Sequence, residues 1–112
     1  MSYGFCDNLW RFDLTTITIT IEHPGEEFFK KFLGGKTLAG WYLNKEVSGD
    51  CDALSPENKI VVAVSIVTGA PIPGSSRFTV SSKSPLSGGF GDSEAGGFFG
   101  PELKFAGYDA II

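Results

Sequence analysis

A glycine-rich stretch with the sequence KSPLSGGFGDSEAGGFFG occupies positions 83–100 and contains three phenylalanines. Glycine allows positive φ and lets a backbone approach a ligand closely, and the N–H groups of such turns form nests for anions such as phosphate. Arg77 and Lys83 lie beside the stretch, and a helix that starts near Phe98 would add its dipole. The residues are therefore compatible with a phosphate-bearing ligand, and a tight aromatic-packed turn without a ligand is the alternative.

Other short motifs fall short of known catalytic sites. Gly35-Lys36-Thr37 looks like the end of a phosphate-binding P-loop, but Lys30 stands where the first glycine belongs, and a predicted helix precedes it instead of a strand. His23 is the single histidine and lies beside a proline, so it cannot form a metal site on its own. No acid–base or nucleophile set is visible, which makes an independent small enzyme the weakest hypothesis.

Composition limits the class of protein. The chain has 112 residues and a net charge of -4, the size of one domain, with basic residues too scattered for a nucleic-acid or anionic-membrane surface. It has no apolar run of spanning length and no signal-peptide pattern, which predicts a cytoplasmic location. Cys6 and Cys51 are too few for a four-cysteine site, so we expect neither a metal site nor an iron–sulfur cluster in this chain.

The amino-terminal region predicts a β-hairpin. Leu9–Leu14 and Thr15–Ile21 read as paired strands that turn near positions 15–16, and the second strand alternates strictly between threonine and isoleucine. This alternation predicts a half-buried strand with Ile17, Ile19 and Ile21 on one face.

The remaining elements are short helices and strands. Phenylalanines at helical spacing and the two glycines at 34–35 indicate one helix and its end, and Thr37 is the expected cap of the next helix. The apolar segment IVVAVSIV predicts a strand buried on both faces, and the glycine-rich stretch is expected to be a folded loop. The predicted helices are Glu26–Leu33, Leu38–Val47 and Phe98–Phe105, and the predicted strands are Ile60–Val67, Arg77–Ser82 and Gly107–Ile112.

The segments SRFTVSSKSPLSG and GGFFGPELKFAGYDAII, preceded by WRFDLTT and KKFLGG, resemble the amino-terminal domain of the tungsten-containing aldehyde:ferredoxin oxidoreductases. The resemblance runs from about Leu9 to Ile112 and implies an α+β, mainly β fold, a β-sheet platform with two or three short helices. It also implies that residues 1–112 form a single domain similar to the first half of that amino-terminal domain. Family members oxidise aldehydes to carboxylates and pass electrons through an iron–sulfur cluster to ferredoxin.

The resemblance also implies a cofactor site. By this resemblance, the arginine of the family's G-G-R-[YF] segment and its N-S-G-G turn contact a tungsten–pterin cofactor and its phosphate–magnesium bridge. The matching positions here are Arg77 and Glu94-Ala95-Gly96-Gly97. The family's Asn-Ser is Glu94-Ala95 in this chain, which places a carboxylate near an anionic group unless a cation intervenes. The family's R-G-L-A is Lys36-Thr37-Leu38-Ala39, and lysine lacks the bidentate fork of arginine.

Two hypotheses about function follow. The first is a binding module that holds a tungsten or molybdenum pterin, of the molybdopterin type, or forms a subunit of an oxidoreductase. The second is a non-catalytic structural protein that kept the fold and lost the cofactor. The apolar segment GYDAII is expected to be an exposed edge strand that pairs with another chain, which predicts a homodimer or a partner subunit.

Overall fold

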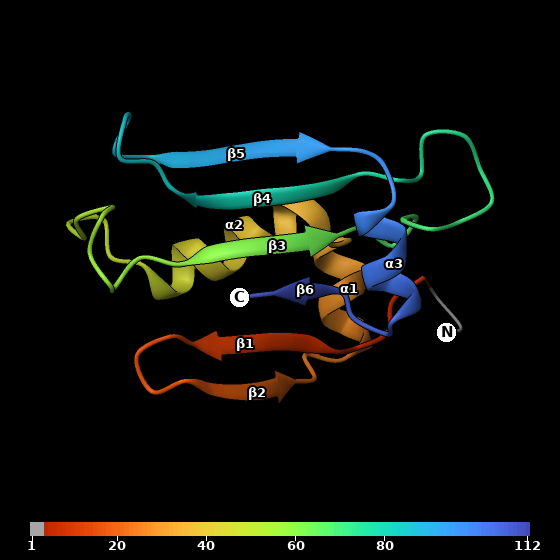
Figure 1. Cartoon of the computed structure of the whole chain (residues 1–112), viewed down its shortest axis with the longest axis horizontal. Coiled ribbons are helices and arrows are strands. Elements are labelled where there is room, and N and C mark those ends of the chain that lie inside the picture. Colours follow the sequence, from red (N-terminus) through yellow and green to blue (C-terminus); the bar gives the residue numbers. More distant parts are fainter. Residues whose placement is uncertain (1–3) are drawn as a thin grey trace.

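The computed structural model describes residues 4–112, in which six strands form one mixed sheet in the order β2-β1-β6-β3-β4-β5 (Figure 1). β6 runs parallel to β1 and antiparallel to β3, and the other neighbours are antiparallel. The strands are β1 Leu9–Asp13, β2 Thr18–Glu22, β3 Ile60–Val64, β4 Phe78–Lys83, β5 Phe90–Ala95 and β6 Ala110–Ile111. The expected α+β, mainly β class is confirmed.

Three helices complete the fold: α1 Glu26–Phe32, α2 Gly35–Glu46 and α3 Phe99–Phe105. Figure 1 shows α1 and α2 behind the sheet, whereas α3 lies in front of it at one end. The core forms between α1, α2 and the covered face, where it combines small and large apolar side chains: Leu9, Phe29, Leu38, Ala39, Tyr42, Leu43, Val61, Ala63 and Ala110. None of the helices within residues 4–112 has the length and hydropathy needed to cross a bilayer.

The junction between α1 and α2 is tighter than the sequence predicts. α1 ends at Phe32 and is capped by Leu33, which adopts a left-handed conformation. Gly34 has φ 83° and precedes α2 directly. The expected cap at Thr37 is wrong, because α2 begins at Gly35 and the Thr37 hydroxyl donates to the carbonyl oxygens of Phe32 and Gly34. The first turn of α2 is therefore made of glycine, lysine and threonine.

Two strands depart from their predicted surroundings. The hairpin turns where expected, but Ile17 lies in the turn with φ 54°, and Ile19 and Ile21 are exposed rather than half-buried. β3 ends at Val64, and Ile60 is 62% exposed, so the prediction of a strand buried on both faces is wrong at its start. Both departures leave apolar side chains on the face that α1 and α2 do not cover.

The glycine-rich stretch contains a strand that the sequence did not predict. Residues 84–89 form a turn, and Phe90–Ala95 then pairs with β4 along its whole length as the edge strand β5. Glycine, aspartate and serine have low strand propensity, so only the pairing with β4 identifies this element.

The carboxyl-terminal segment lies inside the sheet. β6 fits between β1 and β3, and the expectation of an exposed edge strand at GYDAII is therefore wrong; β2 and β5 are the edges. A buried ion pair fixes the approach to β6, since Lys104 Nζ lies 2.6 Å from an Asp109 carboxylate oxygen, with both side chains almost fully buried. The other Asp109 oxygen accepts hydrogen bonds from the backbone of Cys6 and Asn8.

Candidate functional site

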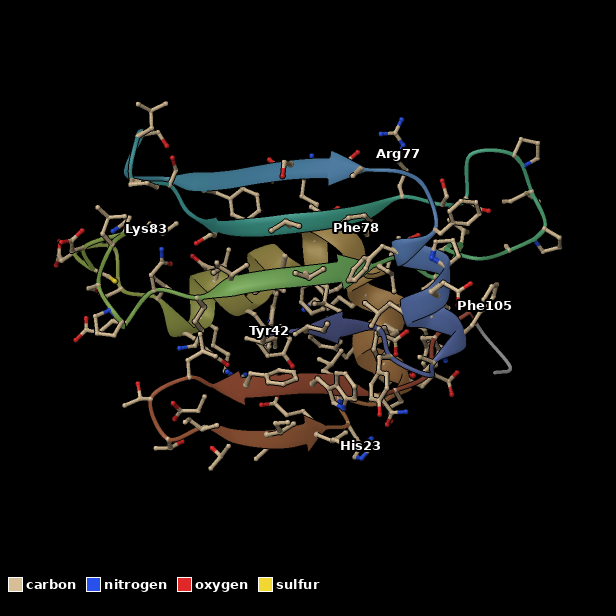
Figure 2. All side chains as sticks on the ribbon, in the orientation of Figure 1. His23, Tyr42, Arg77, Phe78, Lys83 and Phe105 are labelled. Atoms are coloured by element: carbon tan, nitrogen blue, oxygen red, sulfur yellow. The ribbon has the colours of Figure 1, made fainter. Side chains whose placement is uncertain are left out.

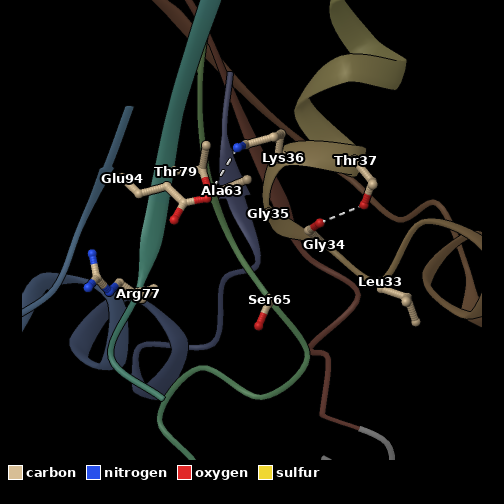
Figure 3. Close-up of a pocket in the computed structure, with 10 residues that line it drawn as sticks. All are labelled: Leu33, Gly34, Gly35, Lys36, Thr37, Ala63, Ser65, Arg77, Thr79 and Glu94. Atoms are coloured by element: carbon tan, nitrogen blue, oxygen red, sulfur yellow. Dashed lines mark hydrogen bonds and ion pairs between the residues drawn. The ribbon is translucent and has the colours of Figure 1, made fainter. Parts of the chain in front are cut away.

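A pocket of about 290 Å³ lies where the α1–α2 junction meets the ends of three strands. Residues 33–37 form one side of the pocket, and Ala63 and Thr79 form its floor. Arg77 lines it at the start of β4, and Glu94 lines it near the end of β5 (Figure 3). The pocket therefore combines basic, acidic and hydroxyl side chains with a helix amino terminus.

The amino terminus of α2 supplies positive potential to the pocket. This helix has 12 residues, and within the described chain no side chain caps its first turn. Gly34 and Gly35 both have positive φ, and a Cβ at Gly34 would lie 2.4 Å from the Val64 carbonyl oxygen. Glycine is therefore required for this close approach of α2 to β3, which leaves the first N–H groups of the helix at the pocket wall. Such groups and the helix dipole favour anions.

Lys36 is held by two carboxylates of β5. Its Nζ lies 2.8 Å from an Asp92 oxygen and 3.4 Å from a Glu94 oxygen, and Figure 3 shows it reaching toward Glu94. The hydrogen bond with Asp92 is the main cause that raises the pKa of Lys36, with Glu94 adding to it. Because Lys36 is half exposed, solvent screens these ion pairs, and the lysine can exchange partners.

Arg77 is a basic side chain without a partner. No hydrogen bond, ion pair or ring contact is found for its guanidinium within residues 4–112, and Figure 2 shows it projecting beside the end of β5. The hydroxyl of Thr79, a residue only 5% exposed, also lines the pocket without a hydrogen bond in that part of the chain. A guanidinium and a hydroxyl without partners are donors that an oxyanion could use.

Comparisons with known proteins agree with this fold. The model of the family "Aldehyde ferredoxin oxidoreductase, N-terminal domain" matches residues 9–112. The chain belongs to this family. The tungsten-containing aldehyde ferredoxin oxidoreductases of Pyrococcus furiosus and Pyrococcus abyssi are 46% and 44% identical to it over 110 residues, which cover 98% of this chain but 18% of each relative.

A solved structure shows the same fold. The active site complex BamBC of benzoyl coenzyme A reductase, determined with 1,5-dienoyl-CoA, contains a chain that superposes with a TM-score of 0.93 at 33% identity. The match covers 97% of this chain and 17% of that one. This member of the aldehyde ferredoxin oxidoreductase family therefore spans less than a fifth of the length of the relatives that it matches.

The structure brings two of the residues expected at the aldehyde ferredoxin oxidoreductase cofactor site together in the pocket. Arg77 and Glu94 both line it. Ala95 ends β5 opposite Phe78, and Gly96 and Gly97 follow it without lining the pocket. The five positions are neighbours because Ala95 pairs with Phe78, the residue after Arg77, but only Arg77 and Glu94 line the pocket.

Sequence reasoning missed several residues that complete the pocket. Gly34 and Thr79 line it, although no motif pointed to either residue as part of a site. The Gly35-Lys36-Thr37 segment was interpreted as an incomplete P-loop, and it does follow a helix rather than a strand. It nevertheless presents a helix amino terminus, which is the physical feature that the P-loop motif encodes. The feature of the sequence that could have indicated the pocket was the pair of glycines before Lys36, even without a complete P-loop motif.

Proposed function

We propose that this chain is a component of an aldehyde ferredoxin oxidoreductase-type enzyme, whose pocket holds the phosphate end of a tungsten or molybdenum pterin. The observation that carries the proposal is the convergence of Arg77, Lys36 and the uncapped start of α2 on one pocket. The tungsten-containing relatives, with up to 46% identity, support the choice of cofactor. Aldehyde oxidation with ferredoxin as acceptor belongs, in this proposal, to the assembled enzyme, and the cytoplasmic location stays a prediction.

The pocket residues suit the anionic end of such a cofactor. The N–H groups of α2 and the Arg77 guanidinium would donate to phosphate oxygens, and the Thr79 hydroxyl would add a third donor. Glu94 opposes this arrangement, but Lys36 is already in place to compensate its carboxylate. The cofactor supplies the redox chemistry when bound, while this chain's residues bind and orient its anionic end.

The first prediction concerns Arg77. Protein made in a host that supplies the cofactor should contain near-stoichiometric tungsten or molybdenum, measured by mass spectrometry of the metal, together with pterin fluorescence. Arg77→Ala should lower both by about tenfold, because a charged hydrogen bond contributes about 1.5–3 kcal/mol. Inorganic pyrophosphate, titrated by calorimetry, should show a similar loss of affinity.

Lys31→Ala is the matched control for Arg77→Ala. Lys31 is exposed on α1, outside the pocket, so its removal changes net charge equally and should leave metal content unchanged. Equal losses of metal in both variants would mean that Arg77 acts only through the net charge of the protein and not through a specific contact with the cofactor. A folded wild-type protein with neither metal nor pterin would contradict the proposal.

The second candidate function is a non-catalytic structural protein that kept the fold and lost the cofactor. Lys36 favours it, because that side chain is satisfied by Asp92 and Glu94 without any ligand. A homodimer was expected on the basis of an exposed carboxyl-terminal edge, and the interior position of β6 removes that basis. A stable dimer by light scattering, with no bound metal or pterin, would favour this second function.

A further inference from the structure

Four side chains that end in oxygen share one face of the β4–β5 pair. In the antiparallel register, Thr79 pairs with Glu94 and Ser81 pairs with Asp92. Paired residues point to the same face of a sheet, and so do residues two positions apart on a strand. The two hydroxyls and the two carboxylates therefore lie together, on the side from which Lys36 of α2 reaches both carboxylates. Figure 3 shows Thr79 and Glu94 beside Lys36.

The two carboxylates converge on a single positive charge. Lys36 Nζ lies 2.8 Å from an Asp92 oxygen and 3.4 Å from a Glu94 oxygen, so oxygens of both strand residues meet at one point. The ammonium occupies this point although Lys36 belongs to the first turn of α2, where the helix dipole disfavours positive charge. The carboxylates therefore outweigh the dipole, and the position suits a cation.

The hydroxyls beside the carboxylates are an independent sign of a ligand. Ser81 is 1% exposed, and no hydrogen-bond partner is found for its Oγ within residues 4–112. A buried hydroxyl without a partner destabilises a folded protein, so its presence needs a physical reason. A cation between Ser81 and Asp92 provides one, because it would use the lone pairs of the hydroxyl oxygen.

We propose that Asp92, Glu94, Ser81 and Thr79 form a binding site for a divalent cation, which displaces the Lys36 ammonium. All four side chains offer oxygen, the ligand that Mg²⁺, Ca²⁺ and Mn²⁺ prefer. No group of three histidine, cysteine, aspartate or glutamate side chains that could hold a metal is found within residues 4–112, so hydroxyls and water complete the coordination. The expectation of no metal site was based on the cysteines, which do not bear on oxygen ligands.

This site goes beyond the proposed function, because its ligands are side chains of this chain and it needs no cofactor. It differs in this respect from the phosphate–magnesium bridge of the family, in which phosphates of the cofactor take part. A divalent ion neutralises both carboxylates, whereas the single charge of Lys36 neutralises only one. Binding of the ion also releases the Lys36 ammonium into the pocket that Lys36 and Arg77 line.

The test uses Mn²⁺, whose electron paramagnetic resonance signal in free solution is lost on binding, and the metal-free full chain without pterin. We expect saturable binding with a Kd of about 0.1–1 mM, the range of weak calcium sites, and competition by Mg²⁺ or Ca²⁺. Asp92→Asn should weaken binding by at least about tenfold, because one of two charged ligands is lost. Lys36→Gln should strengthen it by about tenfold, because the competing ammonium is removed, and a misfolded variant would not produce such a gain.

Ser81→Ala distinguishes a ligand from a hydroxyl with a purely structural role. The alanine removes a buried polar group that has no partner in the described chain, so the metal-free variant should unfold at the same urea concentration as the wild type or a higher one. Its affinity for Mn²⁺ should nevertheless fall severalfold. Unchanged affinity in Ser81→Ala would overturn the proposal.

Lys30→Gln is the matched control for Lys36→Gln. Lys30 is also held by two carboxylates, at 2.7 Å from Glu26 and 3.2 Å from Glu27, but these two carboxylate side chains are 41% and 89% exposed on one helix. The two substitutions change net charge equally, so Lys30→Gln should leave the Mn²⁺ affinity close to that of the wild type. An equal gain in both variants would overturn the proposal, as would a wild type without saturable binding or unchanged affinity in folded Asp92→Asn.

Pyrophosphate titration in the presence of EDTA separates this inference from the proposed function. Pyrophosphate binding together with a failure to bind Mn²⁺ would overturn the cation site and leave the proposed function in place. Binding of Mn²⁺ by a chain that takes up neither pyrophosphate nor pterin would support the cation site and contradict the proposed function. Circular dichroism checks that each variant is folded.

Discussion

At the scale of single residues, Glu94 decides whether the pocket favours anions. It lines the same pocket as Arg77, and Lys36 lies 3.4 Å from its carboxylate. The sequence alone indicated the conflict between a carboxylate and a phosphate but did not show the lysine that reduces it. Lys36 can therefore balance two carboxylates in the free protein and share its charge with an anion in the bound one.

Glu94→Gln is the prediction at this scale. The amide keeps the size of the side chain and removes its charge, so affinity for inorganic pyrophosphate should rise by about two- to fivefold, the range of a partly exposed ion pair. Isothermal titration calorimetry at low and high salt should show the gain shrinking with ionic strength. Glu102→Gln, an exposed carboxylate on α3 outside the pocket, should change affinity less; an equal gain would show that only net charge matters.

The site was predictable only in part because its residues come from separate strands and a helix junction. Arg77 and Glu94 were identified through the family resemblance, and both line the pocket. Thr79 belongs to the pocket only because β4 pairs beside β5, and the α2 amino terminus only because Gly34 brings it against β3. Such long-range placements leave no local signal in the sequence.

At the scale of elements, the α1–α2 junction is the most constrained backbone near the pocket. Gly34→Ala would force a Cβ to within 2.4 Å of the Val64 carbonyl oxygen at φ 83°. The positive φ costs about 1–2 kcal/mol, and the overlap adds about 1–3 kcal/mol. We expect the free energy of unfolding, measured in urea, to fall by their sum, and pyrophosphate affinity to fall with the displacement of α2.

Gly25→Ala separates the two contributions. Gly25 has φ 88°, but nothing lies within 4 Å of the position its Cβ would take. This variant should lose only the cost of positive φ and keep its affinity for pyrophosphate. If both alanine variants lost the same stability, the contact between Gly34 and β3 would be unimportant.

The helices were easier to predict from the sequence than the strands. Helices with charge and apolar periodicity were predicted close to their bounds, as α1 and α3 show. The strand β5 was missed because most of its residues after Phe90 are poor strand formers, and the pairing with β4 holds them extended. The apolar carboxyl-terminal segment was expected at an edge, but neighbours on both sides account for its hydrophobicity equally well.

At the scale of the whole molecule, the charged side chains link α2 to the β1–β2 hairpin. Arg11 forms a two-pronged contact with Glu46, both at 2.8 Å, and also bonds to Glu22. Glu22 accepts a hydrogen bond of 3.1 Å from the buried Tyr42 hydroxyl. This network fixes the hairpin that carries Ile19 and Ile21, so the position of these two exposed side chains depends on it.

The network makes stability depend on pH in two directions. The hydrogen bond from Arg11 holds the pKa of Glu22 below its ordinary value, 4.5, so this stabilisation is complete above that value and is lost as pH falls through the lowered pKa. Burial raises the pKa of Tyr42, with the Glu22 charge adding to it, so stability is retained below about pH 10 and is lost above it, where the unfolded tyrosine ionises first.

Tyr42→Phe tests the alkaline limb. At pH 7 the variant should lose about 1–2 kcal/mol, the value of a hydrogen bond to a charged group, but its free energy of unfolding should fall less steeply above pH 10 than that of the wild type. Urea unfolding followed by tryptophan fluorescence at pH 7, 9.5 and 10.5 measures the slope. Parallel curves for the two proteins would show that Tyr42 does not couple folding to pH. A reduced slope in the variant would show that the hairpin is most stable while the buried Tyr42 phenol stays neutral.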